Sequence, residues 1–311
     1  MYKLNKLTSD SLTSFTSLLK TKWNEIHNET DIFRYKIDEL KERIIDGKYF
    51  LQLNPDRRSK RRTPEEMTSI CQPFDENKFN FNKVSSKELL FSLEGEDGDI
   101  HTVLVNVSPI SRYHSLLCPS VNKCLPQVVT LDSLKLMVQI MFYIEDGDVR
   151  IGFNSICGFA STWQHFKGEM YIILDENSTV PAFCFKIQKD SCNQTLQQVW
   201  KVLEYFLKKS IAHNILFTKR GLGERDDVVY LIVWPRRNTS GAKQLSAFNV
   251  AVLELSGWFP IYDEEDFNNV QAKDLEAELM KWKRDDFKTI CEDIKSIQLC
   301  DKHPKKNMTV T

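Results

Sequence analysis

His165 stands at alternate spacing between Trp163 and Lys167, in a stretch over residues 150–174 whose pattern predicts two strands joined by a glycine-containing turn. Because strand side chains alternate between two faces, these three residues are expected to share one face. A histidine that attacks a phosphate needs polar donors on both sides to stabilise charge on the non-bridging oxygens. His165 is therefore a candidate nucleophile; the alternative is a hydrogen-bonded, chemically idle histidine on a half-buried strand.

Several short motifs keep a fixed order from about Leu53 to about Gly257. They cover residues 106–114, 125–127, 152–155, 159–161, 212–214 and 248–251. Taken together, they resemble the family of GDP-D-glucose phosphorylase and its plant relative GDP-L-galactose phosphorylase, within the histidine-triad superfamily of nucleotidyl transferases and hydrolases.

The central motif of that family is His-x-His-x-His or His-x-His-x-Gln, and its middle histidine takes the nucleotide. Aligned from Gly168, His165 falls on the middle position, Trp163 on the first and Lys167 on the third, with one residue missing between Ser161 and His165. Tryptophan offers a single donor, whereas lysine can still meet a phosphate as a mobile point charge. The resemblance thus implies a nucleotide-accepting histidine in a degenerate triad.

The resemblance also implies further contacts with phosphate or substrate. Asn154 and Ser155 end a Gly-Phe-Asn-Ser motif, and His114 matches a histidine that the superfamily places before its second strand. The family usually has glycine just before that histidine, where this chain has Tyr113. We expect the two motif residues and His114 to contact phosphate or substrate.

Asn80 and Asn82 alternate with two phenylalanines over residues 79–82. On a strand, this pattern lets the aromatic rings stack on a base while the asparagines read its edge. The alternative is an ordinary half-buried strand. His213 and Asn214 match family positions, but no chemical role follows for either from the sequence.

The chain has 311 residues and a formal net charge of −1, so it has no general attraction to nucleic acid or to anionic membranes. The exception is a basic run at residues 57–62. Such a run is typical of a nuclear-localisation signal, of a solvated loop or, by the resemblance, of an arm along the diphosphate of a sugar nucleotide.

Eight cysteines are scattered without a Cys-x-x-Cys pair, and the chain has neither a signal segment nor an apolar run of about 18 residues. These features predict free thiols and a cytoplasmic protein without membrane contact, with a nuclear location left open by the basic run. The sequence has no glycine-rich phosphate loop, serine-nucleophile elbow or metal-binding histidine pair. We therefore expect neither a cofactor nor a metal.

The order of strands and helices indicates a mixed α/β or α+β layer, and its second half looks like a degenerate copy of the first. The resemblance implies an α+β fold of the histidine-triad kind, in which helices pack on a mixed, mainly antiparallel sheet built from two degenerate half-repeats. The expected divisions are an N-terminal helical extension (1–50), a histidine-triad-like half with the catalytic strand (51–176), a second half-repeat (177–270), and a C-terminal helix with a tail (271–311).

Apolar periodicity predicts two helices within residues 8–48, the second over 32–45, and further helices at 130–144, 194–209 and 272–297. Strand patterns lie at 79–82, 102–107, 182–187, 214–218, 227–234 and 248–254, besides the two strands of 150–174. The acidic stretch 94–99 predicts a hairpin turn. The strand at 227–234 is apolar throughout, so it should be covered on both faces.

Two functions remain open. In the first, the resemblance implies phosphorolysis of GDP-D-glucose to glucose 1-phosphate and GDP through a guanylyl group on His165. In the second, the chain is an inactive family member that acts as a nucleotide-binding or protein-interaction module. GDP-sugar and phosphate are the expected partners; a protein partner is expected only in the second case, and nucleic acid in neither.

Overall fold

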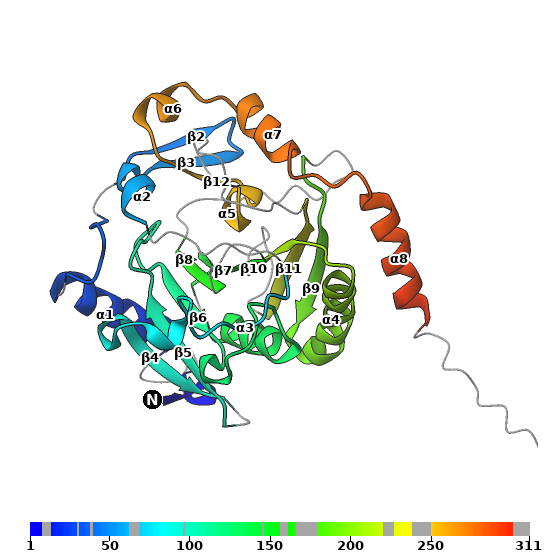
Figure 1. The fold of residues 1–311 in the computed structure, drawn as a ribbon, viewed down its shortest axis with the longest axis horizontal. Helices are drawn as coiled ribbons and strands as arrows, with labels where there is room; N and C mark the ends of the chain where they lie inside the picture. The colour runs from blue at the N-terminus through cyan, green and yellow to red at the C-terminus, as the bar shows by residue number, and fades with distance from the viewer. Residues whose placement is uncertain are drawn as a thin grey trace, which may run out of the picture.

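In the computed structural model, a long sheet curves through the molecule and a small sheet lies on one side of it (Figure 1). The structure describes residues 1–7, 14–29, 31–37, 40–61, 69–95, 98–144, 146–155, 161–165, 179–219, 227–237 and 250–300. The long sheet has nine strands in the order β1-β4-β5-β6-β8-β7-β10-β11-β9, and the small sheet has the order β12-β3-β2.

The long sheet is antiparallel except where β1 joins β4. Its strands are β1 Tyr2–Lys3, β4 Leu89–Glu94, β5 Ile100–Val105, β6 Ser115–Cys118, β7 Val149–Asn154, β8 Ser161–His165, β9 Phe183–Gln188, β10 His213–Thr218 and β11 Val228–Pro235. The small sheet contains β2 Glu42–Ile45, β3 Tyr49–Leu53 and β12 Trp258–Ile261, and its β3 and β12 run parallel.

Eight α-helices are described: α1 Phe15–Glu29, α2 Pro55–Lys60, α3 Leu131–Tyr143, α4 Cys192–Lys208, α5 Val252–Leu255, α6 Glu264–Asn269, α7 Ala272–Met280 and α8 Phe287–Cys300. Within the residues described, no helix combines the length and the apolar character that crossing a membrane requires.

The long sheet is built from the same arrangement twice. One half runs β6–α3–β7–β8 and the other β9–α4–β10–β11, and their strands lie in the matching orders β7-β8-β6 and β10-β11-β9. The halves meet where β7 pairs antiparallel with β10, with Gly152 opposite Leu216. The predicted α+β fold with two half-repeats is confirmed.

Helices α3 and α4 cover one face of the long sheet. At the start of α3, the Thr130 hydroxyl accepts from the N–H of Ser133 at 3.1 Å, and the Ser133 hydroxyl accepts from the N–H of Thr130 at 2.8 Å. The predicted apolar stripe follows, with Leu134, Met137, Val138 and Met141 all buried in the main core. Each such side chain contributes about 1.5–3 kcal/mol through burial.

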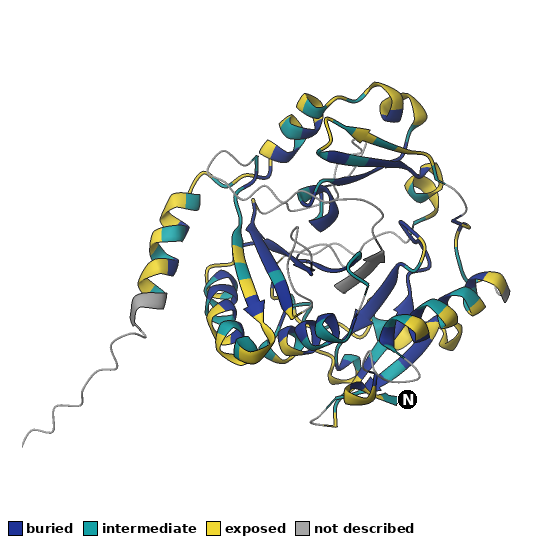
Figure 2. Ribbon diagram, turned by 180° about the vertical axis from the view of Figure 1, so that it is seen from behind, coloured by how far each residue is buried: buried dark blue, intermediate teal, exposed yellow. Residues whose placement is uncertain are grey.

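The opposite face of the long sheet carries two separate apolar clusters. The smaller lies over β5 and β6 and contains Leu104, Leu116 and Cys118. The larger joins Leu216, Ile232 and Trp234 of β10 and β11 to residues of the small sheet, α5 and α7. Figure 2 shows β10 and β11 buried along nearly their whole length, which confirms that the strand predicted at 227–234 is covered on both faces.

The helix predicted over residues 32–45 is wrong, because β2 and β3 form a hairpin there. The connection contains Asp46 and Gly47, which adopt the left-handed φ values of +53° and +63°. Asp-Gly is a favoured pair in hairpin turns because both residues tolerate positive φ. The turn residues therefore prevailed over an apolar spacing that also fits a helix.

Two strand predictions are also wrong. Residues Phe81–Lys83 form a 3₁₀ turn in place of a strand at 79–82, because the Asn80 side chain accepts from the N–H of Asn82 at 3.1 Å and favours a local turn. Of the strand predicted at 248–254, residues 248–249 lie outside the described part, and the remainder leads into helix α5.

The single helix predicted over residues 272–297 is broken into α7 and α8. Between them, the carbonyl of Trp282 accepts from the N–H of Arg237 at 3.1 Å, and the Trp282 ring joins the larger apolar cluster. This tertiary hydrogen bond replaces a bond of a continuous helix.

Trp23 fastens α1 to the long sheet. Its ring is fully buried, its Nε1 donates to the carbonyl of His114 at 3.3 Å, and its ring meets Tyr113 edge-on at a centroid distance of 5.5 Å. Tyr113 has a φ of +66°, a backbone conformation that costs a residue with a side chain roughly 1–2 kcal/mol. The contacts of Trp23 therefore stabilise a strained turn at the start of β6.

Replacing Trp23 with alanine should lower the free energy of unfolding by about 3–5 kcal/mol, because the buried ring leaves a cavity. Urea denaturation measures the change. Lys22→Ala is the matched control: Lys22 lies on the same helix in an exposed pair with Glu25 at 2.6 Å, and its loss should cost less than about 0.5 kcal/mol. Equal losses for the two variants would contradict the role assigned to Trp23.

Candidate functional site

β7 sends its residues alternately to the two faces of the sheet. Val149, Ile151 and Phe153 belong to the core under α3 and α4. Arg150, Gly152 and Asn154 therefore lie on the opposite face, and we call these three residues the β7 strip.

The β7 strip lies between the two apolar clusters of that face. In the row of its central residue, Gly152 stands opposite Thr162 of β8 and Leu216 of β10, and Thr162 stands opposite Leu116 of β6. Glycine in the interior of a strand often marks a place where a ligand or another backbone approaches closely. The β7 strip is therefore the candidate site.

Asn154 is held from two sides. Its Oδ1 accepts from the side-chain amide of Asn214, which stands opposite it on β10, and from the N–H of Val252 at 2.8 Å. In turn, Oδ1 of Asn214 accepts from Nε of Arg236 at 2.5 Å. One chain of hydrogen bonds thus joins β7, β10, the end of β11 and the start of α5, and all three side chains in it are buried.

Ser155 is equally engaged with the protein. Its hydroxyl accepts from the N–H of His213 at 2.8 Å, and its own N–H donates to the carbonyl of His213 at 3.1 Å. The His213 ring places Nδ1 2.9 Å from the carbonyl of Ile211. Burial lowers the pKa of His213 to about 4, so this histidine is neutral at pH 7.

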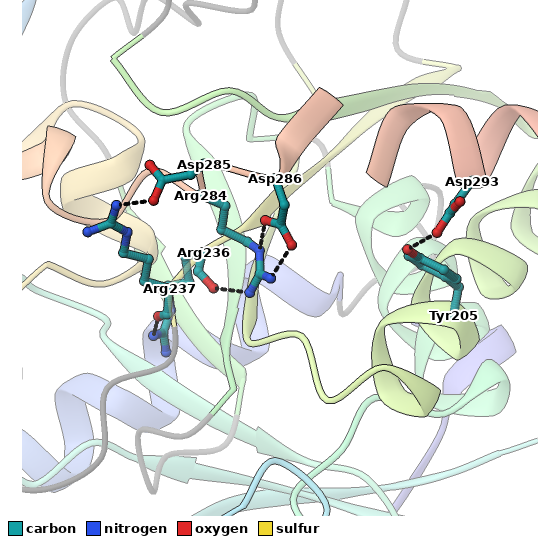
Figure 3. Close-up of polar contacts among 7 residues, drawn as sticks. All are labelled: Tyr205, Arg236, Arg237, Arg284, Asp285, Asp286 and Asp293. Carbon is teal, nitrogen blue, oxygen red and sulfur yellow. Dashed lines mark hydrogen bonds and ion pairs between the residues drawn. The ribbon is translucent and has the colours of Figure 1, made fainter. Parts of the chain in front are cut away.

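Arg236 is anchored beyond its bond to Asn214. Its Nη2 donates to the carbonyl of Ser155 at 2.6 Å, and its guanidinium lies 5.3 Å from the ring centre of Trp282. Figure 3 shows its carbonyl facing Arg284, whose guanidinium pairs with Asp286 at 2.7 Å. These contacts fix the buried guanidinium at the end of β11.

His165 ends the described part of β8, while Lys167 and the side chains of Trp163 and His165 lie outside the described residues. The backbone register pairs His165 with Val149 and Trp163 with Ile151. Both β7 partners belong to the core under α3 and α4. Positions 162 and 164 stand instead in the rows of the β7 strip, opposite Gly152 and Arg150.

His114 is completely buried, and both ring nitrogens have protein neighbours. Its Nδ1 accepts from the N–H of Ile110 at 3.0 Å, and its Nε2 lies 3.3 Å from Nδ2 of Asn106. Burial, helped by the positive charge of Arg57, holds the pKa of His114 well below its ordinary value. The ring organises the turn before β6.

Arg57, in the basic run, belongs to the fold. It lies in α2, which begins after Asn54 caps the helix, and its guanidinium donates to the carbonyl of Ser108. The Tyr35 hydroxyl donates to the carbonyl of Pro109 at 2.6 Å, and the Arg57 guanidinium lies 3.5 Å from that hydroxyl. The beginning of the run is therefore a helix whose Arg57 binds the segment before His114. Of the three alternatives, the loop is wrong for residues 57–60.

The described hydrogen bonds of Asn80 and Asn82 do not involve the β7 strip. Asn80 caps the 3₁₀ turn, and Nδ2 of Asn82 donates to the carbonyl of Val121 at 3.1 Å. The rings of Phe79 and Phe81 meet edge-on at 5.5 Å. The described contacts of this segment are therefore with the protein.

Arg236 and the linking role of Asn214 were missed by the sequence reasoning. The available signal was an arginine immediately after the apolar run of residues 228–235. Among the residues described, no group of three or more His, Cys, Asp or Glu side chains is placed to hold a metal ion.

Both halves of the chain match models of one family. Residues 14–168 match the model described as GDPGP1-like, N-terminal domain, and residues 163–300 match GDPGP1-like, C-terminal domain. The chain is also 34% identical over 300 residues to GDP-D-glucose phosphorylase 1 from Danio rerio, with 86% of each protein covered. The chain belongs to the GDP-D-glucose phosphorylase family.

Two further relatives and one solved structure are also similar to this chain. GDP-D-glucose phosphorylase 1 from Homo sapiens is 30% identical over 294 residues, covering 82% of this chain and 76% of the relative. GDP-L-galactose phosphorylase 2 from Arabidopsis thaliana is 35% identical over 187 residues, covering 53% of this chain and 43% of the relative. Yeast Ap4A phosphorylase Apa2, solved with AMP, shares the fold at a TM-score of 0.59 and 13% identity, over 86% of this chain and 96% of that one.

Acid should destabilise the fold through His213. Its pKa is lowered from 6.5 to about 4 in the folded chain, so the unfolded chain binds a proton that the folded chain does not. The free energy of unfolding keeps its full value above pH 6.5. It decreases as the pH falls from 6.5 towards 4, by roughly 2–4 kcal/mol in total. Urea denaturation at several pH values should show a flatter dependence for His213→Gln than for the unchanged protein. Parallel curves would contradict this origin.

Proposed function

We propose that the chain is a GDP-sugar phosphorylase that acts on GDP-D-glucose with phosphate as the second substrate. The observation that carries the proposal is the fixed amide of Asn154 in the β7 strip, in a chain that belongs to this family over both halves. An amide held by two donors keeps its own N–H groups available for anionic oxygens.

In the proposed reaction, a ring nitrogen of His165 attacks the α-phosphorus of GDP-D-glucose. The bond from that phosphorus to the bridging oxygen breaks, and glucose 1-phosphate leaves with the bridging oxygen. An oxygen of phosphate then attacks the phosphorus of the guanylyl group, the N–P bond breaks, and GDP leaves. Lys167 would neutralise phosphate charge as a mobile cation.

The other predicted site residues differ in whether their side chains are already hydrogen-bonded to the protein. Asn154 is the residue whose described surroundings best fit a phosphate contact. Ser155 and His114 hydrogen-bond to the protein, so we assign their first role to holding the backbone near the site. Asn80 and Asn82 hydrogen-bond within their own turn and to Val121, so we assign their first role to that turn.

A second candidate function is guanine-nucleotide binding without turnover, and the register of β8 favours it. Position 165 stands in the row of Val149, which belongs to the helix-covered core, and not in a row of the β7 strip. In a strand, one residue fewer moves every later position to the other face. Relative to the family motif, the residue missing between Ser161 and His165 therefore turns position 165 to the other face of the sheet.

We further infer a cytoplasmic location. Cys71, Cys118, Cys124, Cys184, Cys192 and Cys291 are free thiols, as is usual in a reducing compartment. A nuclear-localisation role for the basic run is less favoured, because Arg57 is engaged in the clamp before His114.

Purified protein should convert GDP-D-glucose and phosphate to GDP and glucose 1-phosphate, and His165→Ala should abolish the conversion, because the nucleophile is lost. Chromatographic detection of both products measures turnover. The control is thermal stabilisation by GDP, which His165→Ala should retain. Turnover that persists in this variant would exclude His165 as the nucleophile, and no turnover in the unchanged protein would favour the second candidate.

If the second candidate holds, inserting one alanine between Ser161 and Thr162 should create or raise turnover, because it moves position 165 one row past Val149 and so turns it to the face that carries the β7 strip. The same product assay measures the gain. A matched control carries the insertion together with His165→Ala and should show no turnover. Unchanged activity in the insertion variant, with GDP binding retained, would contradict the register explanation.

A further inference from the structure

Arg236 determines the direction of the hydrogen-bond chain that ends at Asn154. A guanidinium has only donors, so Asn214 must turn its Oδ1 towards Nε of Arg236, 2.5 Å away. The Nδ2 group of Asn214 is then left to donate to Oδ1 of Asn154. The orientation of the Asn214 amide therefore follows from the presence of Arg236.

The same constraint passes to Asn154. Besides Asn214, its Oδ1 accepts from the backbone N–H of Val252, and a backbone N–H can only donate. Asn154 must therefore keep its oxygen towards these two donors. Within the described part of the chain, Nδ2 of Asn154 has no acceptor, so its two N–H groups are available in the β7 strip.

We infer that Arg236 is a positioning residue for the nucleotide: through Asn214, it holds the Asn154 amide with its N–H groups towards the phosphate oxygens of a bound guanine nucleotide. This inference rests on the nucleotide binding proposed above. It requires no turnover, because orientation of the amide concerns binding of the phosphates.

An arginine suits this position for a geometric reason. Its planar fork reaches Asn214 through Nε and the carbonyl of Ser155 through Nη2, at 2.5 and 2.6 Å, while its flat face lies over Trp282. A lysine would keep the charge but is a point donor without this fork. Arg236→Lys therefore removes the geometry and keeps the cation.

A double-mutant cycle on GDP affinity tests the inference. Isothermal titration calorimetry with GDP is carried out on the unchanged protein, Arg236→Lys, Asn154→Ala and the double variant, with melting temperatures recorded in parallel. Arg236→Lys should weaken GDP binding about tenfold or more, and this loss should disappear in the Asn154→Ala background. A purely structural role would give the same loss in both backgrounds.

Asn214→Asp is the second variant, in case Arg236→Lys does not fold. An aspartate still accepts from Arg236 but cannot donate to Asn154, so GDP binding should weaken while the melting temperature is kept. Thr218→Val is the control: Thr218 is fully buried on the same strand, and its hydroxyl has no hydrogen-bond partner among the described residues, so GDP affinity should stay unchanged.

The outcomes separate this inference from the proposed function. Coupling between Arg236 and Asn154 supports the inference even if no GDP-D-glucose is turned over. Additive effects of the two variants overturn it and leave the phosphorylase proposal standing. Failure of the unchanged protein to bind GDP overturns both.

Discussion

The antiparallel pairing of β7 with β10 is the interaction on which the rest of the structure depends. It joins two copies of a strand–helix–strand–strand arrangement into one sheet, so that α3 and α4 build a single core on one face. On the other face, it brings Asn154 opposite Asn214. Hydrogen bonds link these buried amides to Arg236 and fix the direction of each amide, and such networks favour one arrangement over alternatives. The joint between the halves is thus also the frame of the candidate site.

The sequence predicted those parts of the fold in which local pattern and tertiary packing agree. The half-repeats were predicted from three features: the apolar stripe of α3, the unbroken apolar run of β11 and the resemblance motifs. Prediction failed where a few residues overrode the periodicity, as Asp46 and Gly47 did in the β2–β3 hairpin and Trp282 did between α7 and α8. The link from Arg236 to Asn154 was not predictable, because it depends on strand register between residues distant in sequence.

Strand register also makes the position of the candidate nucleophile depend on one residue more or less in β8. The side-chain period of a strand is two, so the choice between a histidine beside the β7 strip and one beside the helix-covered core is made by one residue. The binding frame of Asn154, Asn214 and Arg236 comes from β7, β10 and the end of β11, and it does not depend on that choice. Nucleotide binding and nucleophilic attack are therefore separable properties in this fold.

The small sheet gives the chain a particular order of assembly. Its β3 is completed by parallel pairing with β12, where Phe50 stands opposite Trp258. About 200 residues separate these strands, so a ribosome adding about 5–20 residues per second needs roughly 10–40 s between them. During that interval, the β2–β3 hairpin has an unpaired edge, and unpaired edges favour association with other chains. The nascent protein therefore passes through a window in which shielding by a chaperone would protect it from aggregation.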